Sequence, residues 1–133
     1  MKIAVDFDGT LVKWPMEMPS VFNPDLKFDP SAVGETVEIM ANRVKEWLKQ
    51  GHEVVIFTAR VYDPKQAEIA REAINKWCLD TIGEILEVTC VKSHDIDVIY
   101  DDKAVTVEKD TGRILTIGWM EEEDGSDSLG SLL

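Results

Sequence analysis

Asp6-Phe7-Asp8-Gly9-Thr10-Leu11 is the stretch that decides the fold, and it follows directly on the apolar residues Ile3-Ala4-Val5. The apolar run predicts a short buried strand that ends in two carboxylates. Because side chains alternate along a strand, Asp6 and Asp8 are expected on the same side. Gly9 lets the backbone turn sharply and approach a ligand closely. A bare Asp-Gly pair indicates only a turn, but this hexapeptide indicates a ligand site, since open α/β sheets bind ligands at the carboxyl ends of their strands.

A second acidic pair, Asp101-Asp102, ends the apolar segment Asp97-Val98-Ile99-Tyr100. Alone, such a pair is typical of a helix cap or an exposed turn. If this strand and the first are central neighbours in a parallel sheet, however, three or four carboxylates meet at one edge, and their mutual repulsion indicates a bound divalent cation. Oxygen ligands together with water suit Mg2+. The spacing does not decide whether Asp101 or Asp102 contacts the metal.

The first stretch resembles the first motif of the haloacid dehalogenase (HAD) superfamily, mostly Mg2+-dependent phosphatases, and the Asp97-to-Asp102 segment resembles its fourth motif. The resemblance implies that Asp6 attacks phosphorus and becomes an aspartyl-phosphate. It implies that Asp8 is the general acid and base and binds the metal through its main-chain carbonyl. The predicted metal ligands are Asp6, Asp8, Asp101 and Asp102, and the predicted substrate contacts are Gly9, Thr10 and Arg60.

Thr58 ends the apolar run that begins at Glu53, and Ile56-Phe57-Thr58 resembles the second HAD motif, a hydrophobic strand that ends in Ser or Thr. Its hydroxyl would donate a hydrogen bond to a phosphoryl oxygen. Arg60, just beyond, has two interpretations. Its planar guanidinium could hold a substrate anion, or it is an exposed loop charge.

Lys92 is the candidate for the third HAD motif, the lysine that neutralises the nucleophile and the phosphoryl group. The residue after it is Ser93, whereas small HAD phosphatases often have Pro there. Two parallel strands usually need a crossover of about a dozen residues or more, and residues 93–96 are too few for one. Either the segment 86–91 is therefore not an ordinary parallel strand, or the lysine comes from elsewhere. Lys103, directly after the acidic pair, is the substitute.

The remaining pattern alternates strands with helices, which predicts an α/β, HAD-type Rossmann-like parallel sheet flanked by helices, with a C-terminal β-hairpin and no cap domain. Helices are expected over residues 35–50, capped by Ser31 or Thr36 and ended by Gly51, and from Pro64 to Trp77 or Leu79. Further strands are expected over residues 86–91 and 97–100, and a hairpin over 104–108 and 113–119 with its turn at 109–112. These elements form a single domain over residues 1–120, followed by an acidic tail at 121–133 that is expected to be disordered.

The segment 12–34 carries four prolines and predicts an irregular excursion, because proline at this density defeats a helix. HAD proteins place a flap over the active site directly after the first motif. Trp14, Met16, Met18 and Phe22 would either form such a flap or pack the loop onto the body of the domain.

Composition limits the setting in which this protein acts. The 133 residues are 44% hydrophobic, which suits one modest domain, and no apolar run approaches the ~18 to 20 residues of a membrane span. The start of the chain reads as a strand and not as a signal peptide, so we expect a cytoplasmic protein without a membrane partner. Cys78 and Cys90 are expected as reduced, small core residues, and His52 as a turn residue. The net charge of −12 disfavours general binding to nucleic acid.

The resemblance therefore implies a Mg2+-dependent phosphomonoester hydrolase, acting through an aspartyl-phosphate on a small phosphorylated substrate. That substrate is expected to be a nucleotide, a nucleic-acid end or a sugar phosphate. A nucleic acid is expected as a partner only through a phosphorylated end. The alternative is a non-catalytic protein that binds Mg2+ or phosphate, or a receiver-like phospho-acceptor domain. In receiver domains the acceptor Asp lies mid-chain and the lysine lies late, an order that this chain does not follow.

Overall fold

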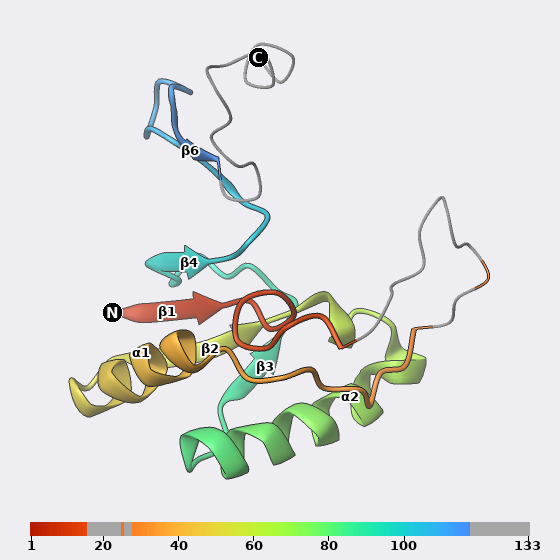
Figure 1. Cartoon of the computed structure of the whole chain (residues 1–133). Helices are drawn as coiled ribbons and strands as arrows, with labels where there is room; N and C mark the ends of the chain where they lie inside the picture. The colour runs from red at the N-terminus through yellow and green to blue at the C-terminus, as the bar shows by residue number, and fades with distance from the viewer. Residues whose placement is uncertain (16–24, 26–27, 118–133) are drawn as a thin grey trace. The chain divides into compact units, whose positions relative to one another are not determined.

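The computed structural model describes residues 1–15, 25 and 28–117, and it divides into two compact units, residues 1–101 and 102–133. The first unit is a parallel four-stranded sheet in the order β3-β2-β1-β4, with two helices (Figure 1). Its elements are β1 (Lys2–Val5), α1 (Glu38–Lys49), β2 (Glu53–Phe57), α2 (Pro64–Trp77), β3 (Glu87–Thr89) and β4 (Val98–Tyr100). The predicted α/β fold is confirmed, whereas a single domain over residues 1–120 stays a prediction.

Both helices pack on the same face of the sheet. The connections β1-α1-β2 and β2-α2-β3 step in one direction across the sheet, so right-handed crossovers place α1 and α2 together. Ile3 and Val5 alternate toward this face and join one buried cluster with Val44 of α1 and Ile74 of α2. Ala4 lies on the other face and is also fully buried. This burial on both faces explains why β1 reads as a continuous apolar run.

The first helix begins later than the sequence predicted, and neither predicted cap caps it. Its N-cap is Val37, which makes no side-chain cap hydrogen bond. The hydroxyl of Thr36 instead accepts a hydrogen bond from the indole N–H of Trp77 at 2.9 Å, and Ser31 bonds Asp29. Tertiary and local partners have therefore taken the hydroxyls that a sequence rule assigns to the helix end. The second helix spans the predicted residues, with Asp63 as its N-cap, and a π-helical turn (Cys78–Ile82) follows it.

Residues 11–13 and 35–37 pair with each other and close the base of the predicted excursion. Leu11 accepts a hydrogen bond from the backbone N–H of Val37, and Lys13 donates one to the carbonyl of Glu35. Gly34 sits against this pairing, because a Cβ added there would overlap the Lys13 carbonyl oxygen and lie 2.8 Å from its carbonyl carbon. The described part of segment 12–34 contains no helix, as predicted, whereas Met16, Met18 and Phe22 lie outside the described residues.

We expect Gly34→Ala to destabilise the protein by about 1–3 kcal/mol, since the methyl group meets backbone that cannot move aside without breaking this pairing. Urea denaturation followed by circular dichroism measures the change. Asn42→Ala, at an exposed site on α1, is the matched control and should be close to neutral. Equal stability of the Gly34 and Asn42 variants would contradict the steric argument.

The short link between β3 and β4 joins two strands that are not neighbours. They lie at the two edges of the sheet, separated by β2 and β1. Residues 90–97 cross between them without a helix, and Asp95 accepts a hydrogen bond from the Lys2 ammonium at 3.0 Å. Lys2 alternates with Ile3 and so lies on the face opposite the helices. The segment 86–91 is therefore an ordinary parallel strand at its centre, paired with β2 alone.

The second unit contains the predicted hairpin, with β5 (Val105–Val107) paired antiparallel to β6 (Ile114–Ile117). Asp110 and Gly112 occupy the predicted turn with φ of 67° and 78°. The guanidinium of Arg113 bonds the Glu108 carboxylate, which together with Thr111 holds the pKa of Glu108 below its usual value. The acidic tail at 121–133 lies outside the described residues.

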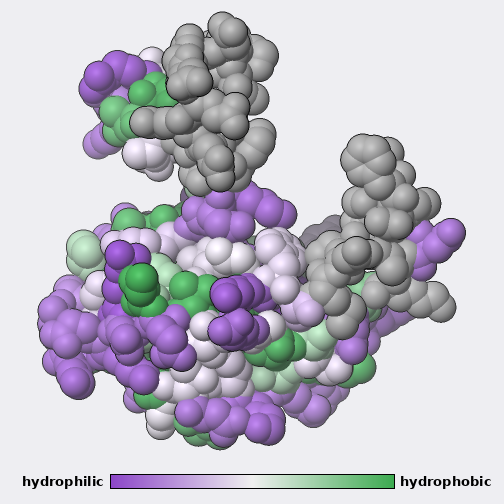
Figure 2. Space-filling view, viewed as in Figure 1, coloured by the Kyte–Doolittle hydropathy of each residue, from purple (hydrophilic) through white to green (hydrophobic). Residues whose placement is uncertain are grey.

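Figure 2 shows hydrophilic and intermediate residues over much of the face of the first unit, and hydrophobic residues in small separate areas. Among the described residues, no helix is long and apolar enough to cross a membrane. Cys78 is buried in the core, as predicted, and its burial raises the pKa of the thiol. The same prediction for Cys90 is wrong, because it follows the edge strand β3 and is exposed.

Candidate functional site

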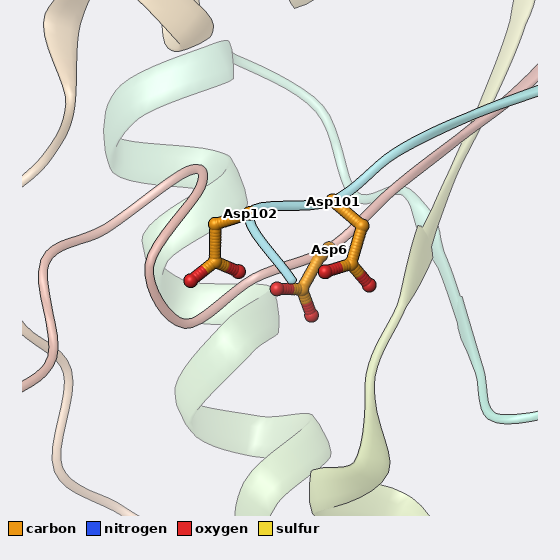
Figure 3. A group of neighbouring side chains, drawn as sticks. All are labelled: Asp6, Asp101 and Asp102. Atoms are coloured by element: carbon orange, nitrogen blue, oxygen red, sulfur yellow. The ribbon is translucent and has the colours of Figure 1, made fainter. Parts of the chain in front are cut away.

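Three carboxylates meet at the carboxyl ends of β1 and β4. Asp6 follows β1, Asp101 and Asp102 follow β4, and the two strands are parallel neighbours with Val5 opposite Tyr100. The Asp6 N–H donates to the Tyr100 carbonyl at 2.9 Å, which continues the pairing past the last strand residue. One carboxylate oxygen from each Asp lies within 4.8 Å of the other two (Figure 3). The sheet thus brings Asp6 of the first acidic pair together with both members of the second pair, Asp101 and Asp102.

All three carboxylates are partly buried, and the donors are oxygens only. Asp102 begins the second unit, but a single peptide bond joins it to Asp101. Partly buried like charges at this spacing favour a counter-cation, and oxygen donors of this kind suit Mg2+. The Thr10 hydroxyl donates to Asp6 at 3.4 Å, so it touches the carboxylate expected to react.

The hexapeptide itself forms a tight turn and does not continue the strand. β1 ends at Val5, and the carbonyl of Phe7 accepts hydrogen bonds from the N–H groups of Thr10, Leu11 and Val12. Gly9 takes φ of 86°, a conformation that other residues rarely adopt. Phe7 is fully buried and anchors the turn in the core.

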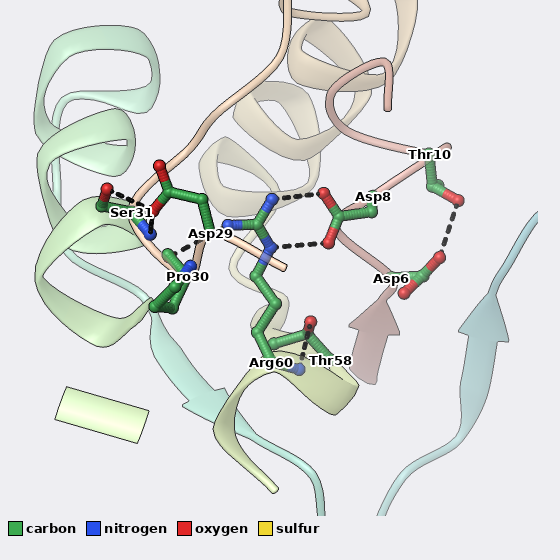
Figure 4. Close-up of polar contacts among 8 residues, drawn as sticks. All are labelled: Asp6, Asp8, Thr10, Asp29, Pro30, Ser31, Thr58 and Arg60. Atoms are coloured by element: carbon green, nitrogen blue, oxygen red, sulfur yellow. Dashed lines mark hydrogen bonds and ion pairs between the residues drawn. The ribbon is translucent and has the colours of Figure 1, made fainter. Parts of the chain in front are cut away.

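This turn separates the two carboxylates of the first motif. Asp6 belongs to the cluster with Asp101 and Asp102, whereas the carboxylate of Asp8 is turned to Arg60 (Figure 4). The expectation that Asp6 and Asp8 share one side is therefore wrong for their carboxylates, because strand alternation ends at Val5. Metal binding by the Asp8 main-chain carbonyl stays a prediction.

Arg60 and Asp8 form a buried two-point ion pair. The guanidinium donates from Nε to Asp8 Oδ2 at 2.6 Å and from Nη2 to Oδ1 at 2.7 Å. The side chains are 2% and 8% exposed, respectively. The interpretation of Arg60 as an exposed loop charge is therefore wrong, and its predicted contact with substrate stays a prediction.

The remaining surroundings of Arg60 come from the turn and from residues 28–30. Its Nη1 donates to the carbonyl oxygen of Pro30 at 3.1 Å. Its guanidinium carbon lies 5.5 Å from the Phe7 ring centre and 5.1 Å from that of Phe28, within the range of cation–π attraction. The sequence did not indicate that Phe28 and Pro30 contact Arg60, because neither residue lies in a pattern that suggests a contact with the segment after β2.

Thr58 follows β2 directly and is buried. Its backbone N–H donates to the Thr89 carbonyl, and its Oγ accepts from the Arg60 N–H at 3.2 Å, where a 3₁₀ turn (Ala59–Val61) begins. Because that hydrogen bond uses the oxygen as acceptor, the hydroxyl proton can still be donated. β2 and β1 are adjacent, so Thr58 and Asp6 follow neighbouring strands.

Lys92 lies in the exposed segment after β3, at the edge of the sheet farthest from β4. Its predicted neutralising role, and the substitution of Lys103 for it, stay predictions. His94 is exposed in the same connection, and His52 accepts or donates a hydrogen bond with the chain's amino group. Asp29, beside Pro30, is bonded by both the hydroxyl and the N–H of Ser31, which lowers its pKa, with a smaller contribution from the Arg60 charge.

Comparison with known proteins supports the fold alone. No family model and no curated protein matches the chain. A solved structure, described as that of a conserved protein from Bacteroides thetaiotaomicron, matches with a TM-score of 0.51 and 24% sequence identity. The match covers 79% of this chain and 78% of that one. The chain is therefore similar in fold to a protein whose description states no activity.

Proposed function

We propose that this protein is a Mg2+-dependent phosphomonoester hydrolase of HAD type that acts through an aspartyl-phosphate. The observation that carries the proposal is the meeting of Asp6 with Asp101 and Asp102 at the carboxyl ends of two adjacent parallel strands. This edge is where open α/β sheets bind ligands. The substrate class is a small phosphorylated molecule or a phosphorylated end: a nucleotide, a nucleic-acid end or a sugar phosphate.

The donor set fits Mg2+, with Asp6 and one or both of Asp101 and Asp102 as ligands. When bound there, Mg2+ would polarise a phosphoryl oxygen and offset the negative charge between substrate and nucleophile. Asp6 carries the reactive carboxylate, since it alone stands in both the acidic cluster and the first-motif turn. Its contact with Thr10 orients this carboxylate.

The chemistry splits one difficult displacement into two steps. The first step requires Asp8 in its protonated form. An Asp6 carboxylate oxygen forms a bond to phosphorus while the ester oxygen leaves and takes the proton that Asp8 carries. Asp8 then removes a proton from water, whose oxygen attacks phosphorus and releases inorganic phosphate with a free Asp6 carboxylate. Thr58 donates to a phosphoryl oxygen, and Lys92 or Lys103 offsets its charge.

One observation favours the non-catalytic alternative, in which the protein binds Mg2+ or phosphate without turnover. Both oxygens of Asp8 accept hydrogen bonds from Arg60, so the group that must exchange protons is held in a buried ion pair. Each carboxylate oxygen has two lone pairs, so Asp8 can carry a proton on one of them, and donate it to the leaving oxygen, while it still accepts from Arg60.

Release of inorganic phosphate from a panel of phosphomonoesters tests the proposal. The panel contains nucleotides, sugar phosphates, 3′- and 5′-phosphorylated oligonucleotides and p-nitrophenyl phosphate, each assayed with Mg2+ and with EDTA. We expect release with Mg2+ and none with EDTA. If no ester is hydrolysed while calorimetry still detects Mg2+ binding, the hydrolase is overturned and the binding protein is supported.

A further inference from the structure

We propose that Arg60 is a positioning residue, which fixes Asp8 and Thr58 for the reaction and does not itself bind the phosphoryl group. This inference rests on the proposed function, and it differs from the sequence-based expectation of a substrate-binding arginine. Four contacts define its place: two to Asp8, one to Pro30 and one through its backbone to Thr58 (Figure 4).

The geometry of the ion pair argues for positioning. Two parallel N–H···O bonds, of 2.6 and 2.7 Å, fix both the distance and the plane of the Asp8 carboxylate. A monodentate cation would leave that carboxylate free to rotate about its last bond. Since Asp8 is nearly buried, no solvent network is available to hold it instead.

The surroundings of the guanidinium argue against a direct role in binding the phosphoryl group. The ring centres of Phe7 and Phe28 lie 5.5 and 5.1 Å from its central carbon, and the carbonyl oxygen of Pro30 accepts a hydrogen bond from Nη1. Only 2% of the Arg60 side chain is exposed. A substrate phosphate that took over the guanidinium would leave the buried Asp8 charge without its cation. Removal of one partner from a buried ion pair is strongly destabilising, because it leaves an uncompensated buried charge. We therefore expect the Arg60 guanidinium to remain bonded to Asp8 and not to exchange Asp8 for a substrate phosphate.

The backbone of Arg60 supplies the second positioning contact. Its N–H donates to the oxygen of Thr58 and so leaves the hydroxyl proton as the group that Thr58 can give. Asp8 and Thr58 come from the ends of β1 and β2, and the turn at Ala59–Val61 brings one residue to both. Arg60 therefore links the proton-transfer group to the predicted phosphoryl-binding hydroxyl.

Leaving-group dependence separates positioning from substrate binding. An alkyl phosphate needs a proton on its departing oxygen, whereas p-nitrophenolate departs without one. If Arg60 positions Asp8, Arg60→Met should lower kcat for the best alkyl ester by about 100-fold and lower it far less for p-nitrophenyl phosphate, with KM nearly unchanged for both. Arg60→Lys keeps the charge but loses the fork, so it should recover part of the alkyl-ester rate.

Two further variants keep the experiment decisive if Arg60→Met does not fold. Phe28→Leu removes an aromatic ring beside the guanidinium and leaves Asp8 and Arg60 intact, so it should show the same leaving-group dependence in weaker form. Arg43→Lys, at an exposed position on α1, is the matched control for the Arg-to-Lys change and should leave both rates unaltered.

The outcomes separate the inference from the proposed function. A wild-type protein that hydrolyses no ester overturns both. An active wild type whose Arg60 and Phe28 variants raise KM for both esters, with kcat retained, overturns positioning and supports substrate binding. An equal fall in kcat for both esters also overturns it, because general loss of structure does not depend on the leaving group. Selective loss with the alkyl ester supports it.

Discussion

An Asp6→Asn variant is expected to release no measurable phosphate from any ester that the wild-type protein hydrolyses. The amide is nearly the same size as the carboxylate, but it is not a nucleophile toward phosphorus. Loss of a nucleophile commonly lowers kcat by about 10⁴- to 10⁶-fold, which takes the rate to the assay background. Asp6 is only partly buried, and the substitution removes one negative charge from a cluster of three, so we expect the fold to survive.

The matched control for this change is Asp95→Asn. Asp95 is an exposed carboxylate paired with Lys2, which lies at the amino end of β1, opposite the end that carries Asp6. Both variants lose the same charge from the same kind of side chain, and only the Asp6 variant should lose turnover. Circular dichroism and unfolding in urea show whether both are folded. Turnover that persists in a folded Asp6→Asn protein would show that another group attacks phosphorus.

The location of the acidic cluster was predictable because it depends on the order and direction of the strands more than on individual side-chain contacts. Each acidic pair follows an apolar run, and parallel strands end at the same edge of a sheet. The sequence does not itself show that β1 and β4 are adjacent, and the parallel pairing of Ile3 with Val98 and of Val5 with Tyr100 bears this assumption out. The expectation that both strands are central is wrong, because β4 is an edge strand of three residues.

The ion pair between Asp8 and Arg60 was not predictable by the same reasoning. The partners lie 52 positions apart, and Arg60 follows the strand in what reads as a polar loop. Its burial depends on the turn after β1, on the 3₁₀ turn after β2 and on Phe28 and Pro30 together. No local pattern encodes that combination. The strand-alternation rule failed at Asp8 for a related reason, since the rule holds only while the chain remains extended.

Errors at the element boundaries have one physical cause. Sequence rules pair a polar side chain with the nearest backbone N–H group that lacks a hydrogen bond, whereas the folded chain also offers partners that are distant in sequence. Thr36 accepts from Trp77 across 41 positions and leaves α1 to begin without a side-chain cap. Asp63 has no such distant competitor among the residues that the structure describes, and it caps α2 where the sequence places the helix start, just before Pro64. Local rules therefore hold where tertiary partners are absent.

Binding of Mg2+ is expected to raise the free energy of unfolding of the wild-type protein, whether or not any ester is hydrolysed. A ligand that binds only the folded state stabilises it by about 2.7 kcal/mol at 100 times its dissociation constant. Asp6, Asp101 and Asp102 supply the ligand oxygens only when β1 and β4 are paired, so the unfolded chain cannot present the same site. Urea titrations with Mg2+ and with EDTA measure this difference.

Single Asn substitutions at Asp101 and Asp102 assign the metal ligand between them. Replacement of the residue that binds Mg2+ should remove most of the Mg2+-dependent stabilisation, whereas replacement of the other should remove little. Without metal, the same substitutions should leave stability equal or slightly higher, because one of three neighbouring negative charges is lost. Asp110→Asn is the matched control, since Asp110 has φ of 67° and Asn tolerates that conformation. If Mg2+ stabilised all of these variants and Asp6→Asn as strongly as the wild type, the ion would bind elsewhere on this acidic chain, and the carboxyl ends of β1 and β4 would lose their role as the metal site.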